Sequence, residues 1–145
     1  MRILAIDYGD KNIGLAVSDP LFLTAQSLGR YKKKTAAEDA FYFRQLSFQY
    51  DIKEVVIGLP LRMDGSEGSR AEITRRFGRW LKEVLNIPVF FWDERLTTKE
   101  ALDLLSLRGT GLKEKKQKVD QVSAALILSS YLEKRKAKNH DPESG

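Results

Sequence analysis

The sequence predicts an α/β protein built on one mixed five-stranded sheet, with helices on its faces. Three strand-like apolar segments precede the first helical pattern, and two more alternate with helices after it. The connection between the first two segments is too short for a crossover, so these two pair as an antiparallel hairpin. The first three of the four helical patterns each open on a Ser/Thr-x-x-Glu capping box. The expected sheet therefore has three antiparallel strands followed by two parallel ones.

The first three strands come from the N-terminal third of the chain. Arg2–Tyr8 is a run of apolar β-forming residues, typical of a strand buried on both faces. Gly9–Asn12 is a turn, and Ile13–Ser18 is the returning strand. Asp19–Pro20 ends the hairpin, and Ala25–Tyr31 is the third strand.

Two helices and a buried strand follow. The capping box Thr35–Glu38 opens a helix that runs to about Tyr50, and Glu54–Gly58 is a short buried strand. Leu59–Gly68 is a loop longer than a simple connection needs, and a second capping box, Ser69–Glu72, opens the next helix. The apolar positions expected on one face of this helix are Ile73, Phe77, Leu81 and Val84.

The last part of the chain supplies one more strand and two more helices. Pro88–Trp92 is the fifth strand, and the capping box Thr97–Glu100 opens a helix through Leu107. The final helix, Val119 to about Lys134, is apolar on most sides, which predicts that it is buried against the sheet.

Length and composition limit the classes of protein. With 145 residues we expect one domain, residues 1–136, followed by a disordered polar tail, residues 137–145. Cysteine is absent, which excludes disulfides and thiolate metal sites, and the single histidine, His140, lies in the tail. That placement argues against zinc and against a histidine base. No apolar run is long enough to span a membrane, so we expect a cytoplasmic protein.

The positive charge is clustered. The formal net charge is +5 and the sequence pI is about 9.4. Any single cluster could be only a solvated helix face, but several together favour a polyanionic partner, nucleic acid above all. The clusters are Arg30–Lys34, Arg70–Arg79, Lys113–Lys118 and Lys134–Lys138.

Three acidic residues are candidates for one metal site. Asp7 interrupts an apolar strand, where an unpaired carboxylate would cost several kcal/mol of desolvation, so a bound cation is the expected compensation. Glu94 follows the fifth strand, and Asp120 begins the final helix. Because ligands of open α/β sheets bind outside the carboxyl ends of strands, these acids could meet at that edge.

The chemistry that such a cluster permits is phosphodiester hydrolysis. Oxygen ligands without His or Cys favour Mg²⁺ or Mn²⁺. Two such ions can activate a water molecule and stabilise the leaving oxygen, and no histidine base is then required.

Each acid also has a simpler interpretation. Asp7 could accept hydrogen bonds from the amides of the following turn, Glu94 could be a surface ion-pair group beside Arg95, and Asp120 could serve the helix dipole. The metal hypothesis depends on whether the three side chains meet.

Four basic residues near the predicted active edge are candidate phosphate contacts: Lys11, Arg62, Arg70 and Arg95. Arg95 could instead hold Glu94 in place, and the sequence leaves both roles open.

Four motifs together resemble the YqgF family, over residues 1–135 and in the right order. Members of this family are described as pre-16S ribosomal RNA nucleases and as Holliday-junction-resolvase-like proteins. The motifs are Asp7–Ser18, Gly58–Leu61 with Asp64–Gly65, Asp93–Thr98, and Lys118–Asp120 before an Ala-rich helix.

The resemblance implies a ribonuclease H-like fold and a divalent-metal nuclease that matures the 5′ end of small-subunit ribosomal RNA in the cytoplasm. It makes Asp7, Glu94 and Asp120 the catalytic acids and the ligands of Mg²⁺ or Mn²⁺. The related resolvases carry a further acid one helical turn after the last-helix Asp, where this chain has Ser123. Substrate phosphates would then complete the metal site.

Other functions stay open at this point. Resolution of branched DNA would need two active sites and hence a homodimer, whereas an RNA nuclease could be a monomer. An RNA-binding ribosome assembly factor with vestigial acids belongs to a different class. A kinase-like fold also begins with an Asp-x-Gly hairpin, but it needs two such domains around the nucleotide.

Overall fold

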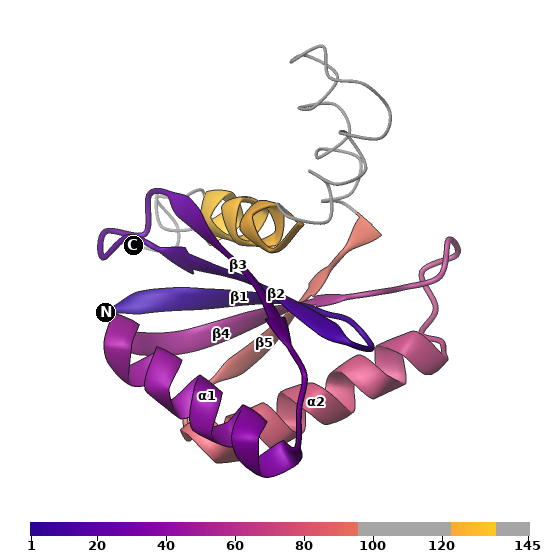
Figure 1. The fold of residues 1–145 in the computed structure, drawn as a ribbon. Coiled ribbons are helices and arrows are strands. Elements are labelled where there is room, and N and C mark those ends of the chain that lie inside the picture. The colour runs from indigo at the N-terminus through magenta and orange to yellow at the C-terminus, as the bar shows by residue number, and fades with distance from the viewer. Residues whose placement is uncertain (96–122, 136–145) are drawn as a thin grey trace, which may run out of the picture.

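The computed structural model describes residues 1–95 and 123–135 (Figure 1). They form a five-stranded sheet with helices on both faces. Residues 123–135, yellow in Figure 1, form a further helix without a label, called the C-terminal helix below. The labelled elements are β1 (Arg2–Tyr8), β2 (Asn12–Ser18), β3 (Ala25–Lys32), α1 (Ala36–Tyr50), β4 (Ile52–Leu59), α2 (Ser69–Leu85) and β5 (Val89–Asp93).

The strand order is β3-β2-β1-β4-β5, which confirms the predicted mixed sheet. β3, β2 and β1 pair antiparallel, whereas β1, β4 and β5 pair parallel. The carboxyl ends of the three parallel strands therefore lie at one edge of the sheet, where Asp7 lies near the end of β1 and Glu94 follows β5.

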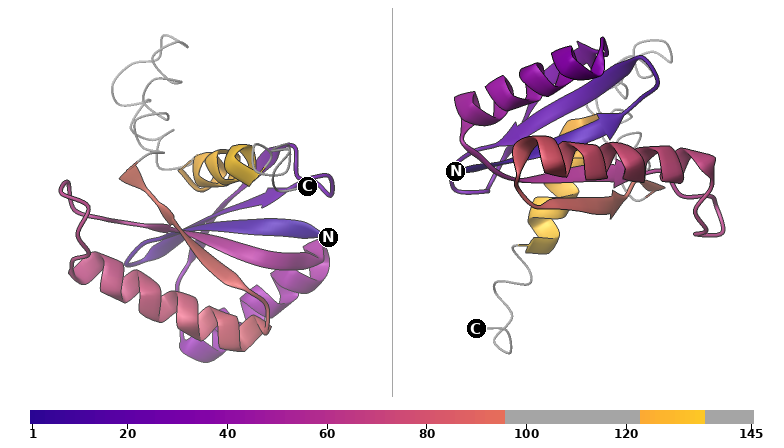
Figure 2. Two further views of the ribbon diagram at one scale, coloured as in Figure 1. Left: turned by 180° about the vertical axis from the view of Figure 1, so that it is seen from behind. Right: turned by 90° about the horizontal axis from the view of Figure 1, so that it is seen from below.

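The sheet lies between two helical layers (Figures 1 and 2). α1 and α2 cover one face, and the C-terminal helix covers the other, as its apolar composition predicted. Side chains of β1 alternate between the two cores: Leu4 and Ile6 pack with α1 and α2, whereas Ile3 and Ala5 pack against the C-terminal helix. The same alternation directs Asp7 to the face of the C-terminal helix.

Both helices begin where the sequence predicts, but only α1 has the predicted side-chain cap. The Thr35 side chain accepts a hydrogen bond from the Glu38 amide at 3.2 Å, as a capping residue should. In α2 the N-cap is Gly68, without a side-chain cap, and Ser69 is already helical. The Arg62 guanidinium lies against Gly68 so closely that a Cβ there would be 2.8 Å from Arg62 Nε. The capping box predicted at Ser69 is therefore wrong.

The buried face of α2 also differs from the prediction. Ile73 is 40% exposed and Val84 is only half-buried. Gly78 lies directly over Phe91 of β5, since a Cβ on Gly78 would be 2.5 Å from Phe91 Cζ. Because of this close approach, the face of α2 that carries the small residues packs against the sheet. The buried residues are Ala71, Thr74, Phe77, Gly78 and Leu81.

Several predicted segments lie outside the described residues. They are the helix Thr97–Leu107, the lysine-rich stretch to Lys118, the start of the final helix with Asp120, and the tail at 137–145. Within residues 1–95 and 123–135, no helix has the length and apolar character needed to cross a membrane.

Candidate active site

Asp7 lies near the carboxyl end of β1, and each of the two neighbouring strands has a glycine beside it. Gly14 of β2 is its antiparallel partner, and Gly58 of β4 follows Ile57, which pairs with Ile6. Directly opposed residues point to the same face of a sheet, so two glycines flank the Asp7 carboxylate where side chains would otherwise crowd it. The carboxylate is half-buried.

Glu94 reaches this carboxylate from the end of β5. Its amide donates to the Leu59 carbonyl at 3.1 Å, which extends the pairing of β4 and β5 by one residue. Its carboxyl lies above Gly58, where a Cβ would be 3.6 Å from Glu94 Cδ. Gly58 also meets the C-terminal helix, because the same Cβ would be 2.6 Å from Ile127 Cδ1. The glycine thus admits both Glu94 and the helix.

Asp7 and Glu94 are in direct contact, and their charges repel. Burial raises the pKa of the Glu94 carboxyl to about 8, helped by the negative charge of Asp7 and a hydrogen bond with it. The Arg70 guanidinium acts in the opposite direction, lowering that pKa. Two carboxylates that share a proton are a pair that a divalent cation can bridge in its place.

Ser123 contacts the same carboxylate from the C-terminal helix. Its Oγ donates to Asp7 Oδ2 at 2.6 Å. The sequence marked Ser123 only as a departure from the acid of related resolvases, and nothing in the pattern predicted this hydrogen bond. Asp7 therefore receives a partner from the loop after β5 and another from the C-terminal helix.

The structure brings together two of the three predicted acids. Asp120, the third predicted acid, lies outside the described residues. Within the described ranges, no three His, Cys, Asp or Glu side chains form a cluster that could hold a metal ion.

The predicted phosphate contacts Lys11 and Arg70 flank the β1–β2 turn. Lys11 lines a pocket of about 270 Å³ that also contains Asp7. Arg70, at the start of α2, forms a salt bridge with Asp10 in the turn. That bridge lowers the pKa of the exposed Asp10 carboxyl.

Arg95 and Arg62 organise the loop between β4 and α2. Arg95 pairs with Asp93 through Nε at 3.1 Å and Nη2 at 2.8 Å, and it donates to the carbonyls of Arg62 and Met63. Its guanidinium also lies about 3.6 Å from the Cβ position of Gly65, which has φ +89°. Arg95 thus fastens the loop to the end of β5, and no described hydrogen bond joins it to Glu94.

A pocket of about 210 Å³ opens on the other side of the carboxylate pair. It is lined by Pro60, Leu61, Glu94 and Arg95. Together with the pocket at Asp7, it places open space on both sides of the pair, along the edge of the sheet.

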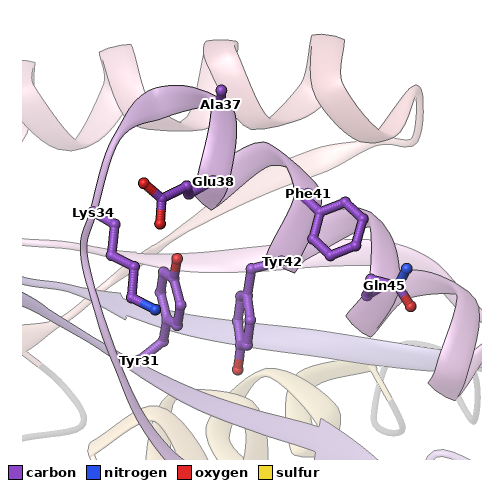
Figure 3. Close-up of a pocket in the computed structure, with 7 residues that line it drawn as sticks. All are labelled: Tyr31, Lys34, Ala37, Glu38, Phe41, Tyr42 and Gln45. Carbon is purple, nitrogen blue, oxygen red and sulfur yellow. The ribbon is translucent and has the colours of Figure 1, made fainter.

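A further pocket, of about 420 Å³, lies between β3 and α1 (Figure 3). The rings of Tyr31 and Tyr42 stack there with centroids 3.8 Å apart, and the Tyr31 hydroxyl donates to Asp39 at 2.7 Å. Tyr31 packs with the core under α1 and α2, on the opposite face of the sheet from Asp7. This pocket is therefore separate from the carboxylate pair.

Sequence reasoning missed a second strand-borne carboxylate, Glu54. It is 6% exposed at the opposite end of β4, where it accepts from the Tyr131 hydroxyl at 2.6 Å and from Arg135 Nη1 at 3.0 Å. Glu54 opens an apolar strand, as Asp7 interrupts one, so the same signal was available. Its partners are donors of the C-terminal helix, which Glu54 anchors.

The strand order and the two helical layers are those of a ribonuclease H-like fold, with acids at the carboxyl ends of β1 and β5. A family model described as "RuvX: Holliday junction resolvase" matches residues 1–134. The chain belongs to this family, which is the one that the motifs resembled. It is a nuclease, and so a hydrolase.

Curated relatives match over nearly their whole length. A protein of Syntrophus aciditrophicus named "Putative pre-16S rRNA nuclease" is 47% identical, over 92% of this chain and 89% of its own. A protein of Koribacter versatilis with the same name is 43% identical, over 99% of this chain and 94% of its own.

Solved structures at lower identity share the fold. Thermus thermophilus RuvC aligns with a TM-score of 0.55 at 16% identity, over 94% of this chain and 97% of that one. The fowlpox virus Holliday junction resolvase aligns with a TM-score of 0.53 at 17% identity, over 92% and 99% of the two chains.

Proposed function

We propose that this protein is a divalent-metal-dependent endonuclease that processes the 5′ end of pre-16S ribosomal RNA in the cytoplasm. The observation that carries the proposal is the direct contact of the Asp7 and Glu94 carboxyls at the carboxyl edge of the sheet in a chain of a nuclease family. The relatives named for pre-16S rRNA, which match almost end to end, support the choice of substrate.

The carboxylate pair fits a hard divalent cation. Asp7 and Glu94 offer only oxygen ligands, and we propose Asp120 as a third ligand from the final helix. A bound Mg²⁺ or Mn²⁺ would activate the attacking water and stabilise the leaving oxygen of the phosphodiester.

The residues around the pair position it and admit the substrate. Ser123 fixes the Asp7 carboxylate by its hydrogen bond, and Gly14 adds no side chain to the pocket beside it. Lys11 and Arg95 line the two pockets, Arg70 pairs with Asp10 of the β1–β2 turn, and Arg62 lies against Gly68 before α2; these four are the proposed phosphate contacts.

A cleavage panel tests this function. The substrates are an RNA spanning the mature 5′ end of bacterial 16S rRNA, an unrelated single-stranded RNA and a four-way DNA junction, each with Mg²⁺ or with EDTA. We expect Mg²⁺-dependent cleavage of the first substrate in preference to the others. Asp7→Asn should abolish it, whereas Asp51→Asn, at the opposite edge of the sheet, should retain it.

The other outcomes identify the other functions. Faster cleavage of the junction, by a protein that sediments as a dimer, would replace the RNA substrate by branched DNA. RNA binding without cleavage under any metal would make the protein an assembly factor and contradict the nuclease.

A further inference from the structure

Asp7 and Arg30 face each other across a glycine. Asp7 pairs with Gly14, and Gly14 pairs with Arg30, so the three residues form one row across β1, β2 and β3. Directly opposed residues project to the same face, and neighbouring strands are about 4.8 Å apart, which puts the outer two Cα atoms about 10 Å apart. Because Gly14 has no side chain, β2 contributes nothing that fills the space between them.

This space is part of the pocket of about 270 Å³ described above. Asp7, Gly14 and Arg30 line it from the sheet, and Gly9, Asp10, Lys11 and Asn12 line it from the end of the hairpin, where Asp10 is paired with Arg70. The pocket thus extends from the carboxylate pair toward the outer strand of the sheet, and two cations stand along it.

The two cations of the pocket differ from the arginines around them. Arg70 and Arg95, at the same edge of the sheet, each form a salt bridge with a carboxylate. Arg30 is exposed, and in the part of the chain that the structure describes neither Arg30 nor Lys11 forms a salt bridge. Their charges are therefore available to an anion in the pocket.

We propose that Arg30, across Gly14 from Asp7, binds a backbone phosphate of the nucleic-acid strand next to the phosphate that is to be cleaved at the Asp7–Glu94 pair. This proposal rests on the proposed nuclease function and names a substrate-positioning residue for it. A guanidinium suits the role because it contacts two phosphate oxygens at once, and Lys11 adds a second charge from the turn. Arg30 fixes the register of the strand and does not contact the reacting atoms.

Gly14 gives a second, independent variant. A Cβ at this position would be 3.4 Å from Asp7 Cβ and 3.7 Å from Ala124 Cβ, which is ordinary van der Waals contact. Gly14→Ala should therefore fold normally while placing a methyl group on the floor of the pocket, between Asp7 and Arg30.

Binding measurements in EDTA test the proposal without any need for cleavage. The dissociation constant of the pre-16S RNA fragment is measured by fluorescence anisotropy between about 50 and 200 mM salt. The proteins are wild type, Arg30→Gln, Gly14→Ala and the control Arg44→Gln, which removes an exposed charge from α1 on the opposite face. We expect Arg30→Gln to bind about tenfold more weakly, with a salt slope lower by about 0.7, the value for one contact to a single strand.

Single methylphosphonates, moved one position at a time along the RNA, identify the phosphate. We expect one position at which this neutral group weakens binding by the wild type and by Arg44→Gln but has no effect on Arg30→Gln. Gly14→Ala should weaken binding while its unfolding midpoint stays near that of the wild type. Equal binding by Arg30→Gln and Arg44→Gln would overturn the proposal. So would a result in which every methylphosphonate that weakens binding by the wild type also weakens binding by Arg30→Gln.

The same data separate this proposal from the proposed function. If the wild type binds RNA through Arg30 but never cleaves it, the phosphate site stands and the nuclease function is contradicted. If the wild type cleaves RNA and Arg30→Gln binds and cleaves equally well, the nuclease function stands and the phosphate site at Arg30 is contradicted.

Discussion

Glu94 is the residue at which charge, burial and function are most closely linked. Its carboxyl is held beside Asp7 at the end of β5, and burial first, then the Asp7 charge, raises its pKa to about 8. Near neutral pH and without a cation, Glu94 therefore keeps a proton. A divalent cation competes with that proton, so cation binding should strengthen as the pH rises toward 8.

The pKa of Glu94 predicts how stability changes with pH. The folded state binds this proton more tightly than the unfolded chain, whose carboxyl has the ordinary value of 4.5. The contribution of Glu94 is therefore most favourable below about pH 4.5, and it is lost as the pH rises to about 8. Urea unfolding in EDTA between pH 5 and 8.5 should show this loss in the wild type and a flatter profile in Glu94→Gln.

Glu83→Gln is the matched control, since Glu83 is an exposed carboxyl on α2. It should keep the wild-type profile, and Mg²⁺ should reduce the loss in both proteins that retain Glu94. An unchanged slope in Glu94→Gln would show that the pair is not the source of the pH dependence.

At single residues, the sequence was informative where a charge conflicts with an apolar pattern. Asp7 was identified because a buried strand does not tolerate an unpaired carboxylate, and Glu54 at the start of β4 carries the same signal. The hydrogen bond from Ser123 could not be predicted, because it depends on how the C-terminal helix lies across the sheet.

At the scale of the elements, the two labelled helices begin in different ways. Thr35 caps α1 through its side chain, whereas α2 begins at Gly68 without a side-chain cap. Thr35→Ala should therefore lower the free energy of unfolding by about 1 kcal/mol. Ser69→Ala should change it by less than about 0.5 kcal/mol. Equal losses in urea unfolding would mean that Ser69 caps α2 after all.

One end of the C-terminal helix is hydrogen-bonded to Glu54, and the other end contributes Ser123 to the carboxylate pair. Tyr131 and Arg135 donate to the buried Glu54, whereas Ser123 donates to Asp7. Burial, followed by the hydrogen bond to Glu54, raises the pKa of Tyr131 to about 12. The Glu54 contacts thus fix the position from which Ser123 reaches the carboxylate pair.

Loss of one anchoring hydrogen bond should be measurable. Tyr131→Phe removes a donor from a carboxylate that is 6% exposed, and we expect the free energy of unfolding to fall by about 1–3 kcal/mol. Glu133→Gln, an exposed change on the same helix, should have little effect. A Tyr131→Phe protein as stable as Glu133→Gln would show that Glu54 does not anchor the helix.

Strands were easier to predict than helix details. Alternating or continuous apolar runs and short turns were enough for all five strands, with ends correct to within two residues. In α2 the capping box and the burial of Ile73 and Val84 were wrong, whereas Phe77 and Leu81 are buried as predicted; the buried face depends on Phe91 lying against Gly78. Such contacts join residues from different elements and leave no local pattern.

For the whole molecule, the parallel pairing of β1, β4 and β5 is what creates the site. It places the end of β1, the loop after β4 and the end of β5 at one edge, so Asp7 and Glu94 meet although they are far apart in sequence. That meeting was predictable from the rule for strand ends. That Gly14 and Gly58 lie on either side of Asp7 could not be predicted, because it depends on the register of the sheet.

The most direct test asks whether Asp7 and Glu94 act as one unit. Single-turnover cleavage of the pre-16S RNA fragment is measured with saturating Mg²⁺ for the wild type, Asp7→Asn, Glu94→Gln and the double variant. If both carboxylates serve one metal site, each single variant loses activity by orders of magnitude, and the double variant loses no more than the worse of the two. Cleavage at the wild-type rate by either single variant, or losses that multiply in the double variant, would contradict a shared site.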